Sequence, residues 1–341
     1  MGVQITEILE GHKISIDELS GRILAVDAPN HLYQFLTTIR ARDGSAFTDS
    51  HGNITSHLIG LFSRSANLMQ KGLKLAYVFD GPAPHLKFRE LEKRKALKQE
   101  AEKKYQEAVR QGDEQAARQL AGRFSRLTPE MIKEAKALME GLGIPHVDSP
   151  SEAEAQASFM AARGDAFAVA SQDADCFLFG APRLIRNLSV TGRRKAAGKL
   201  AYSTISPELF SLEENLRRLK ITREQLIALC MLVGTDYDSG GIRGYGPKKA
   251  LELVRKSGTD FETAFTQVKW SDNFDVPWKD VFSLFKNAEV TGNYRLSWKT
   301  PDRERVINLL CNEHDFSPER VNSTLDTIGR ATPQKGLGDF F

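Results

Sequence analysis

The sequence predicts an α/β fold in which a mostly parallel central sheet carries helices on both faces. Four short apolar runs, rich in branched or aromatic residues, have the composition of buried parallel strands. They span residues 22–27, 74–80, 166–171 and 183–188. Helical patterns lie between the early runs, and this strand–helix–strand alternation is typical of a sheet covered on both sides.

From residue 206 onward the pattern is helical. A helix over 223–233 runs into a glycine-rich turn, and a second helix begins at Pro247, a residue suited to the first helical position. The turn is not a P-loop, because Pro247 stands where that motif needs lysine. Glycines let a backbone approach a phosphate, and a helix N-terminus attracts its charge. We interpret residues 234–254 as a helix–hairpin–helix-type motif that grips a nucleic-acid backbone, with a plain loop as the alternative.

The composition, 41% hydrophobic and 27% charged over 341 residues, is that of a soluble globular protein with room for one large domain or two ordinary ones. No apolar run approaches the roughly 18 residues of a membrane span, and no signal-peptide pattern opens the chain. Cys176, Cys230 and Cys311 lie far apart without zinc spacing, which suggests a reducing compartment and no disulfide framework.

The net charge of +3 is close to neutral, but the basic residues are clustered. They concentrate over residues 87–126, in 193–199 between two strand-like segments, and among the glycines of 243–249. Local basic clusters on a nearly neutral chain suit a polyanion binder that also keeps a concentrated acidic site. For 87–126 alone, an ordinary solvated helix surface is an equal alternative.

Acidic residues follow the predicted strands at the points where the strands end. Asp27 ends the first strand, Asp80 ends the second, and Asp173 and Asp175 follow the third. Sites in open parallel sheets form beyond the carboxyl ends of the strands. We therefore expect these carboxylates to meet at one edge of the sheet.

Glu152 and Glu154 begin the helix that precedes the third strand. Two residues apart, they cannot share one face of a regular helix, and acids near a helix start are common because they favour the positive end of the dipole. The repeated acids at the strand ends nevertheless favour a second interpretation, in which both glutamates face a bound cation. The spacing alone does not place this helix start at the same edge.

Oxygen ligands without His or Cys select a hard cation, Mg²⁺ or Mn²⁺, rather than zinc. Carboxylates crowded this closely need a counter-charge. Their number exceeds what a single Mg²⁺ uses, so the sequence predicts a pair of ions about 4 Å apart, as in phosphodiester hydrolysis.

These stretches together resemble a family over nearly the whole chain. The sequence is similar to the structure-specific flap endonucleases of the archaeal and eukaryotic replication type, in the 5′-nuclease superfamily with its PIN-like fold. The matching stretches are Val26–Ala28 with Tyr33–Phe35, Thr55–Leu58, Val78–Gly81, Pro150–Gln156, Ser171–Asp173, Gly234–Tyr237 and Gly244–Lys249. Pro29-Asn30-His31, between the first two, departs from the usual filler.

The resemblance implies a set of site residues. Two Mg²⁺ ions, with Mn²⁺ able to substitute, would bind Asp27, Asp80, Glu152, Glu154, Asp173, Asp175 and Asp236. Lys87 and Arg94 would steady the scissile phosphate, and their spacing of seven puts them on one helix face. Tyr33 would stack on a substrate base, although by itself a residue at this helical spacing is more often core. Arg40, Gly244, Gly246, Lys248 and Lys249 would contact DNA, with K⁺ assisting at the glycine-rich turn, while Asp238 reads as a turn residue.

The tail from residue 329 ends in two phenylalanines that are costly to expose on a polar segment, which indicates an anchor for a partner. Docking onto the protein's own surface is the alternative. By resemblance, Gln334, Leu337, Phe340 and Phe341 form the QxxLxxFF box for the sliding clamp (PCNA). No long lysine-rich extension follows the box, so the archaeal type fits better, with a cytoplasmic, nucleoid-associated location; a eukaryotic protein would be nuclear.

The expected organisation is one monomeric nuclease globule over 1–328 with a flexible tail over 329–341. The globule divides into an N-terminal region (1–100), a helical arch (87–126), an internal region (127–255) and a helical part (256–328). The expected function is a metal-dependent 5′ flap endonuclease, with 5′–3′ exonuclease activity, in DNA replication and repair. A non-catalytic clamp-tethered binder of branched DNA and a related PIN-like ribonuclease are the alternatives.

Overall fold

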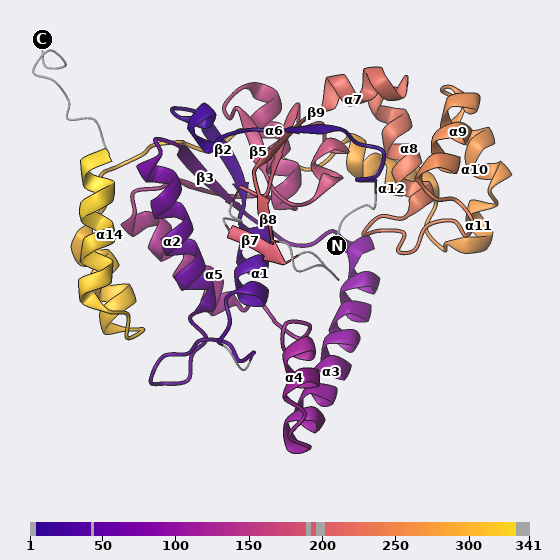
Figure 1. The fold of residues 1–341 in the computed structure, drawn as a ribbon. Helices are drawn as coiled ribbons and strands as arrows, with labels where there is room; N and C mark the ends of the chain where they lie inside the picture. The colour runs from indigo at the N-terminus through magenta and orange to yellow at the C-terminus, as the bar shows by residue number, and fades with distance from the viewer. Residues whose placement is uncertain (1–4, 42–43, 189–191, 196–201, 332–341) are drawn as a thin grey trace, which may run out of the picture.

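The computed structural model describes residues 5–41, 44–188, 192–195 and 202–331 of the chain. A central sheet lies between two layers of helices, with one pair of helices extending away from it (Figure 1). Within these ranges no helix combines the length and the apolar character that crossing a membrane requires.

The central sheet has seven strands in the order β1-β9-β6-β5-β2-β3-β4. Five neighbouring strands in this order, from β6 to β4, are mutually parallel. Strand β9 runs antiparallel to both of its neighbours, β6 and β1. The strands are β1 (Gly11–Lys13), β2 (Ile23–Asp27), β3 (Lys74–Phe79), β4 (His146–Asp148), β5 (Ala168–Ala170), β6 (Arg183–Arg186) and β9 (Glu208–Ser211). The four predicted strands and the mostly parallel sheet are confirmed.

The prediction of a purely helical pattern from residue 206 onward is wrong at its start. Glu208–Ser211 forms β9, which pairs with both β6 and β1. Four residues leading directly into a helix carry too little periodicity to separate a strand from a helix. Strands β1 and β4, with three residues each, were not predicted from the sequence for the same reason.

Alternation along β2 explains why both faces of the sheet are covered. Leu24 and Val26 point into one hydrophobic core, and Ala25 between them points into the other. The first core is closed by α1 (Ala28–Thr38), α2 (Ser56–Gln70), α5 (Pro129–Gly141), α13 (Arg303–Ile307), η4 (Asn308–Asn312) and α14 (Pro318–Ala331). The second is closed mainly by α6 (Ala153–Arg163), α7 (Leu212–Leu219), α8 (Arg223–Val233), α9 (Pro247–Ser257), α10 (Phe261–Gln267), α11 (Trp270–Asn273) and α12 (Trp278–Lys286).

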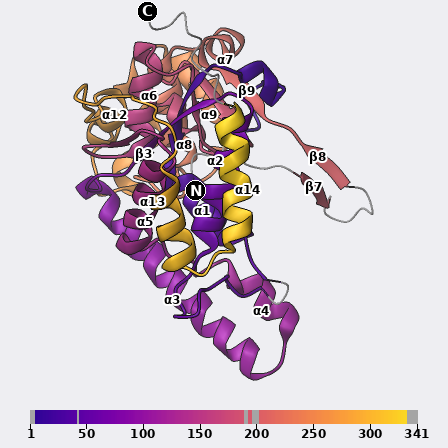
Figure 2. The same cartoon turned by 90° about the vertical axis from the view of Figure 1, so that its left-hand side faces the viewer.

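The basic segment 87–126 forms a helical hairpin that extends from the sheet, as Figures 1 and 2 show. It consists of α3 (Phe88–Arg110), which continues the short turn η2 (His85–Lys87), and α4 (Glu114–Ala121). Between the two helices Gly112 adopts φ +71°, and the Asp113 side chain caps α4. Ala108 is buried where the helices meet, whereas Leu97 is 64% exposed. The predicted helical arch is thus present as a protruding pair of helices.

A second, two-stranded sheet projects from the body of the molecule in a different direction from the arch, at the right of Figure 2. Its strands are β7 (Gly192–Lys195) and β8 (Tyr202–Ile205), which pair antiparallel. Sequence reasoning placed the basic cluster 193–199 between two strand-like segments, but its first three residues lie within β7 itself.

Candidate metal and nucleic-acid site

The carboxyl ends of neighbouring strands bring the predicted acids to one edge of the sheet. Asp27 is the last residue of β2 and is buried, and its Oδ1 accepts a hydrogen bond from the Asn30 backbone N–H at 3.0 Å, which caps α1. Asp80 follows β3, and its Oδ1 accepts from the Ala153 N–H at 2.7 Å. That bond ties the end of β3 to the first residue of α6.

Strand β4 explains how Glu152 and Glu154, only two residues apart, both reach the acidic edge of the sheet. It runs parallel to β3, with Phe79 in register with Asp148, so its carboxyl end faces the same edge as Asp80. The chain then turns directly into α6, with Glu152 at the N-cap and Glu154 in the first turn. The two glutamates reach the site because the helix starts there and the N-cap residue has extended backbone geometry.

Three acids form the tightest group. Glu154, Asp173 and Asp175 each offer a carboxylate oxygen, and these oxygens lie within 4.8 Å of one another. Asp173 caps the short turn η3 (Ala174–Phe177), accepting from the Asp175 N–H at 3.1 Å. Asp175 is buried within this turn.

The charges at this edge repel one another. Burial, followed by the negative charge of Asp80, raises the pKa of Asp27 to about 7, against hydrogen bonds that lower it. Loss of solvent and then the charges of Asp173, Asp27 and Asp175 raise the pKa of Glu154 well above its ordinary value. This donor set fits hard divalent cations, because it offers carboxylate oxygens that need positive charge to remain ionised together.

Asp236 lies in the loop after α8 and is close enough to Asp173 for its negative charge to raise the pKa of that residue, in addition to the larger effect of burial. Its Oδ2 lies 3.2 Å from the Lys87 Nζ, and its Oδ1 accepts from the Arg94 guanidinium. Although burial raises the pKa of Asp236, the positive charges of Lys87 and Arg94 hold it below the ordinary value. The structure thus brings the seven predicted acids together.

Lys87 and Arg94 both face the acids from the base of the arch. Lys87 also forms an ion pair with Glu152, and Arg94 pairs with Glu90 at 3.1 Å. Both side chains reach Asp236, although Lys87 lies in η2, at the N-cap of α3, and only Arg94 lies within the helix.

Tyr33 is 38% exposed on α1, which excludes the alternative that its ring belongs to the core. The Lys98 Nζ lies 4.7 Å from the centre of its ring, a cation–π contact between α1 and the arch. Arg40 is half-buried and donates to the Gly44 carbonyl at 2.9 Å and to the Ser125 hydroxyl at 2.5 Å. Its guanidinium therefore joins the loop after α1 to the end of the arch segment.

The predicted helix–turn–helix is present, with α8 ending at Val233 and α9 beginning at Pro247. Gly241 adopts φ +58°, and a Cβ there would lie 2.3 Å from the Val233 carbonyl oxygen, so the turn requires glycine. Asp238 is buried and accepts from the Thr235 N–H at 3.1 Å, which confirms it as a turn residue. Gly246 caps α9.

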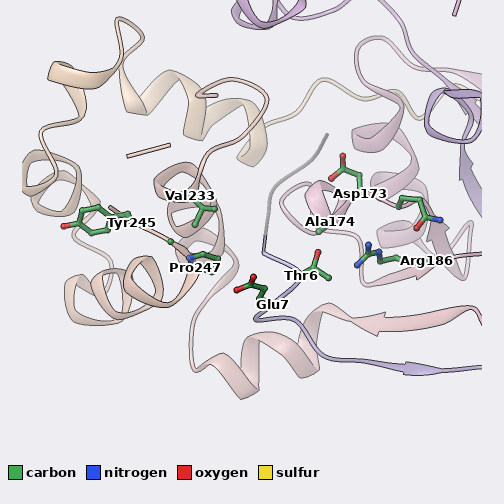
Figure 3. Close-up of a pocket in the computed structure, with 10 residues that line it drawn as sticks. Thr6, Glu7, Asp173, Ala174, Arg186, Val233, Tyr245 and Pro247 are labelled. Carbon is green, nitrogen blue, oxygen red and sulfur yellow. The ribbon is translucent and has the colours of Figure 1, made fainter. Parts of the chain in front are cut away.

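The first turn of α9 exposes the predicted contact residues Lys248 and Lys249, and Gly244 nearby is also exposed, with φ +85°. A cavity of about 520 Å³ lies between the acids and this turn. In Figure 3 Asp173 and Arg186 lie on one side of it, Tyr245 and Pro247 on the other, and Glu7 between them.

Sequence reasoning missed two residues whose side chains bond to the acids and a third that holds the backbone next to one of them. The Ser171 hydroxyl donates to Asp27 Oδ2 at 2.8 Å, the Asn30 side-chain oxygen accepts from the Gln172 N–H at 3.2 Å, and the Tyr237 hydroxyl donates to Glu152. Position offered a signal for each, since all three lie within three residues of a predicted ligand. The predicted clamp-binding residues Gln334, Leu337, Phe340 and Phe341 lie outside the described residues.

Known proteins match this chain along its length. Residues 1–101 match the XPG N-terminal domain and residues 143–236 the XPG I-region. Flap endonuclease 1 of Pyrococcus furiosus is 50% identical over 331 residues, covering 97% of this chain and 96% of that protein. Flap endonuclease 1 of Aeropyrum pernix is 46% identical over 341 residues, covering 99% and 97%.

Solved structures agree with this relationship. Flap endonuclease-1 from Methanococcus jannaschii superimposes with a TM-score of 0.77 at 40% identity, covering 97% of this chain and 98% of that one. The catalytic core of Rad2 in complex with DNA substrate has a TM-score of 0.70 at 23% identity, covering 96% and 100%, and shares the fold. The chain belongs to the flap endonuclease 1 family.

Proposed function

We propose that this protein is a structure-specific 5′ flap endonuclease, with accompanying 5′–3′ exonuclease activity, that removes displaced single strands at branched duplex DNA. The observation that carries this proposal is the convergence of acids from four strand ends and one interhelical loop beneath an arch whose Lys87 and Arg94 face them. Family membership supports the same activity.

The reaction is hydrolysis of a phosphodiester near the branch point. Two Mg²⁺ ions held by the seven acids, with Mn²⁺ able to substitute, would supply Lewis-acid chemistry that activates water and stabilises the leaving oxygen. Burial, together with the repulsion between neighbouring carboxylates, raises the pKa of Asp27 and of Glu154, and a bound cation would relieve both.

The chain's own cations act on the substrate. Lys87 and Arg94 reach the acids from the base of the arch, so a scissile phosphate that approaches the acids meets both side chains. Their fixed positive charges stabilise the negative charge that develops on the phosphate oxygens. Exposed Tyr33 supplies an aromatic face on which an unpaired base stacks, and the arch guides the 5′ strand toward the acids.

The duplex is held by the glycine-rich turn and α9. Lys248, Lys249 and the N-terminus of α9 offer positive charge to backbone phosphates on the far side of the 520 Å³ cavity from Asp173, and Arg40 adds a further contact. K⁺ at the turn would assist this grip. The protein acts as a monomer, and residues 334–341 bind the sliding clamp.

A cleavage assay with a labelled 5′-flap duplex tests the function. The purified protein should release the flap at the branch only when Mg²⁺ is present, and Asp173→Ala should abolish most cleavage while leaving flap binding within a few-fold. A single-stranded RNA of the same sequence should be a poor substrate. Tight flap binding without any Mg²⁺-dependent product would refute the proposal, and preferential cleavage of the RNA would assign a ribonuclease instead.

A further inference from the structure

The carboxylate of Glu152 is shared between two side chains from different segments of the chain. The Tyr237 hydroxyl donates to its Oε2, while Lys87 Nζ pairs with its Oε1. A positive charge thus stands at one oxygen, and a neutral donor holds the other. Tyr237 is separated from Glu152 by 85 positions in the chain and directly follows Asp236.

The core of the helical half holds the Tyr237 ring in place. Phe285 of α12 meets it edge-on, with ring centres 5.3 Å apart and an interplanar angle of 80°. Phe285 is itself only 1% exposed and packs against Phe179, also with ring centres 5.3 Å apart. The hydroxyl is therefore presented to Glu152 from a rigid support.

Glu152 has no comparable restraint within its own helix. It is the N-cap of α6, yet its side chain makes no capping hydrogen bond. It also lines a cavity of about 560 Å³, together with Pro82, Pro84, His85, Phe179 and Tyr237. Without the tyrosine hydroxyl, the ion pair with Lys87 would alone oppose rotation of the carboxylate toward this cavity and away from the other acids.

We infer that Tyr237 is a positioning residue that orients Glu152 for a divalent cation. The Tyr237 hydroxyl holds Oε2 of Glu152 in place. Oε1 of the same carboxylate therefore keeps facing the position that the ammonium group of Lys87 now occupies, where a metal cation could also bind. Outer-shell hydrogen bonds of this kind commonly change metal affinity about 10- to 100-fold. This inference rests on the metal-dependent function proposed above.

The test is Mn²⁺ binding to the full-length protein without DNA, after treatment with a chelator. MnCl₂ is titrated while the free ion is followed by electron paramagnetic resonance. Tyr237→Phe removes the hydroxyl and keeps the ring against Phe285. Tyr294→Phe is the matched control, because it removes a tyrosine–carboxylate hydrogen bond, to Asp165, at the amino end of β5 and therefore away from the site.

We expect Tyr237→Phe to weaken the tighter Mn²⁺ site about tenfold, while Tyr294→Phe stays within twofold of the unsubstituted protein. In a Glu152→Ala background, Tyr237→Phe should add no further loss, because its partner is gone. Equal affinities of the two Phe variants would overturn the inference, as would the same tenfold loss in the Glu152→Ala background. If the unsubstituted protein itself bound no Mn²⁺, the proposed metal site would fail rather than the role of Tyr237 alone.

Discussion

Lys87 Nζ lies 3.2 Å from Asp236 Oδ2 and also pairs with Glu152, so one ammonium group joins two acids from different parts of the chain. Asp236 comes from the loop after α8 and Glu152 from the start of α6. The base of the arch is thereby fastened to the acidic edge of the sheet. The same contacts place Lys87 in competition with any cation that binds these two carboxylates.

Replacing Lys87 with methionine should have opposite effects on metal binding and on cleavage. Without DNA, Lys87→Met should tighten Mn²⁺ binding several-fold, because it removes a positive charge from Glu152 and Asp236. With a 5′-flap substrate and saturating Mg²⁺, single-turnover cleavage should slow by about 10²–10³-fold, the cost of losing a charge that stabilises the transition state.

Lys104→Met is the control for Lys87, because Lys104 lies in α3, the helix that begins directly after Lys87, but pairs with Glu100 in solvent. It should change both measurements less than threefold. Slower cleavage in Lys87→Met together with weaker Mn²⁺ binding would show that Lys87 supports the acids rather than competing at them.

Asp27 should make the stability of the metal-free protein fall as pH rises. Burial raises its pKa to about 7 in the fold from an ordinary value of 3.8, so between these values the folded state binds a proton that the unfolded state releases. The free energy of unfolding therefore falls between about pH 4 and pH 7, by up to about 4 kcal/mol for a pKa shift of this size. The Asp27→Asn variant has no such proton to release, and its amide oxygen can still accept the hydrogen bond of the Ser171 hydroxyl.

Urea unfolding at pH 5, 6, 7 and 8 in the presence of a chelator measures this effect. The unsubstituted protein should lose stability relative to Asp27→Asn as pH rises to about 7, and the difference should then level off. Excess Mn²⁺ should cancel much of the loss, because the ions bind the ionised acids of the folded state. A difference that stays constant from pH 5 to 8 would be inconsistent with a raised pKa at Asp27.

The sequence predicted those parts of the fold and site whose signal is local. The continuous apolar runs of β2 and β3 marked buried parallel strands, and Asp27 and Asp80 could be assigned to one edge by their positions at the strand ends. The helix boundaries at Val233 and Pro247 were also correct, because a glycine-rich turn separates them.

What the sequence could not predict depends on packing between distant segments. Strand β4 has only three residues, too few for a periodic signal, yet it determines where Glu152 points. Asp236 was placed in the site by resemblance alone, because its contacts with Lys87 and Arg94 span the two halves of the fold. The exposure of Tyr33 likewise follows from the way α1 meets the arch, and a helical spacing contains no such information.

Tyr33 should act through its ring rather than its hydroxyl. Tyr33→Ala should slow cleavage of a 5′-flap about 10- to 100-fold, in keeping with the roughly 1–3 kcal/mol that stacking of one base contributes. Tyr33→Phe keeps the aromatic face and should remain within threefold. A 2-aminopurine at the nucleotide beside the scissile bond reports stacking directly, and its fluorescence should change on binding to the Phe variant but not to the Ala variant. Equal loss in both variants would assign the effect to the hydroxyl.

Lys248 should contribute to duplex binding without affecting the chemical step. It is exposed in the first turn of α9, across the cavity from Asp173, where it can neutralise a backbone phosphate. Lys248→Ala should weaken flap binding uniformly across sequences and lower the slope of log K against log [salt] by about 1, as expected for one lost phosphate contact.

Lys256→Ala is the matched control, because Lys256 is exposed in the last turn of the same helix. The affinities are measured by fluorescence anisotropy in Ca²⁺ between 50 and 200 mM KCl (a range over which phosphate contacts typically dominate the salt dependence), and single-turnover rates at saturating enzyme should match those of the unsubstituted protein. An unchanged salt slope would remove Lys248 from the DNA contact surface, and an equal change in Lys256→Ala would mean that the charge of the whole helix, rather than its first turn, attracts the duplex.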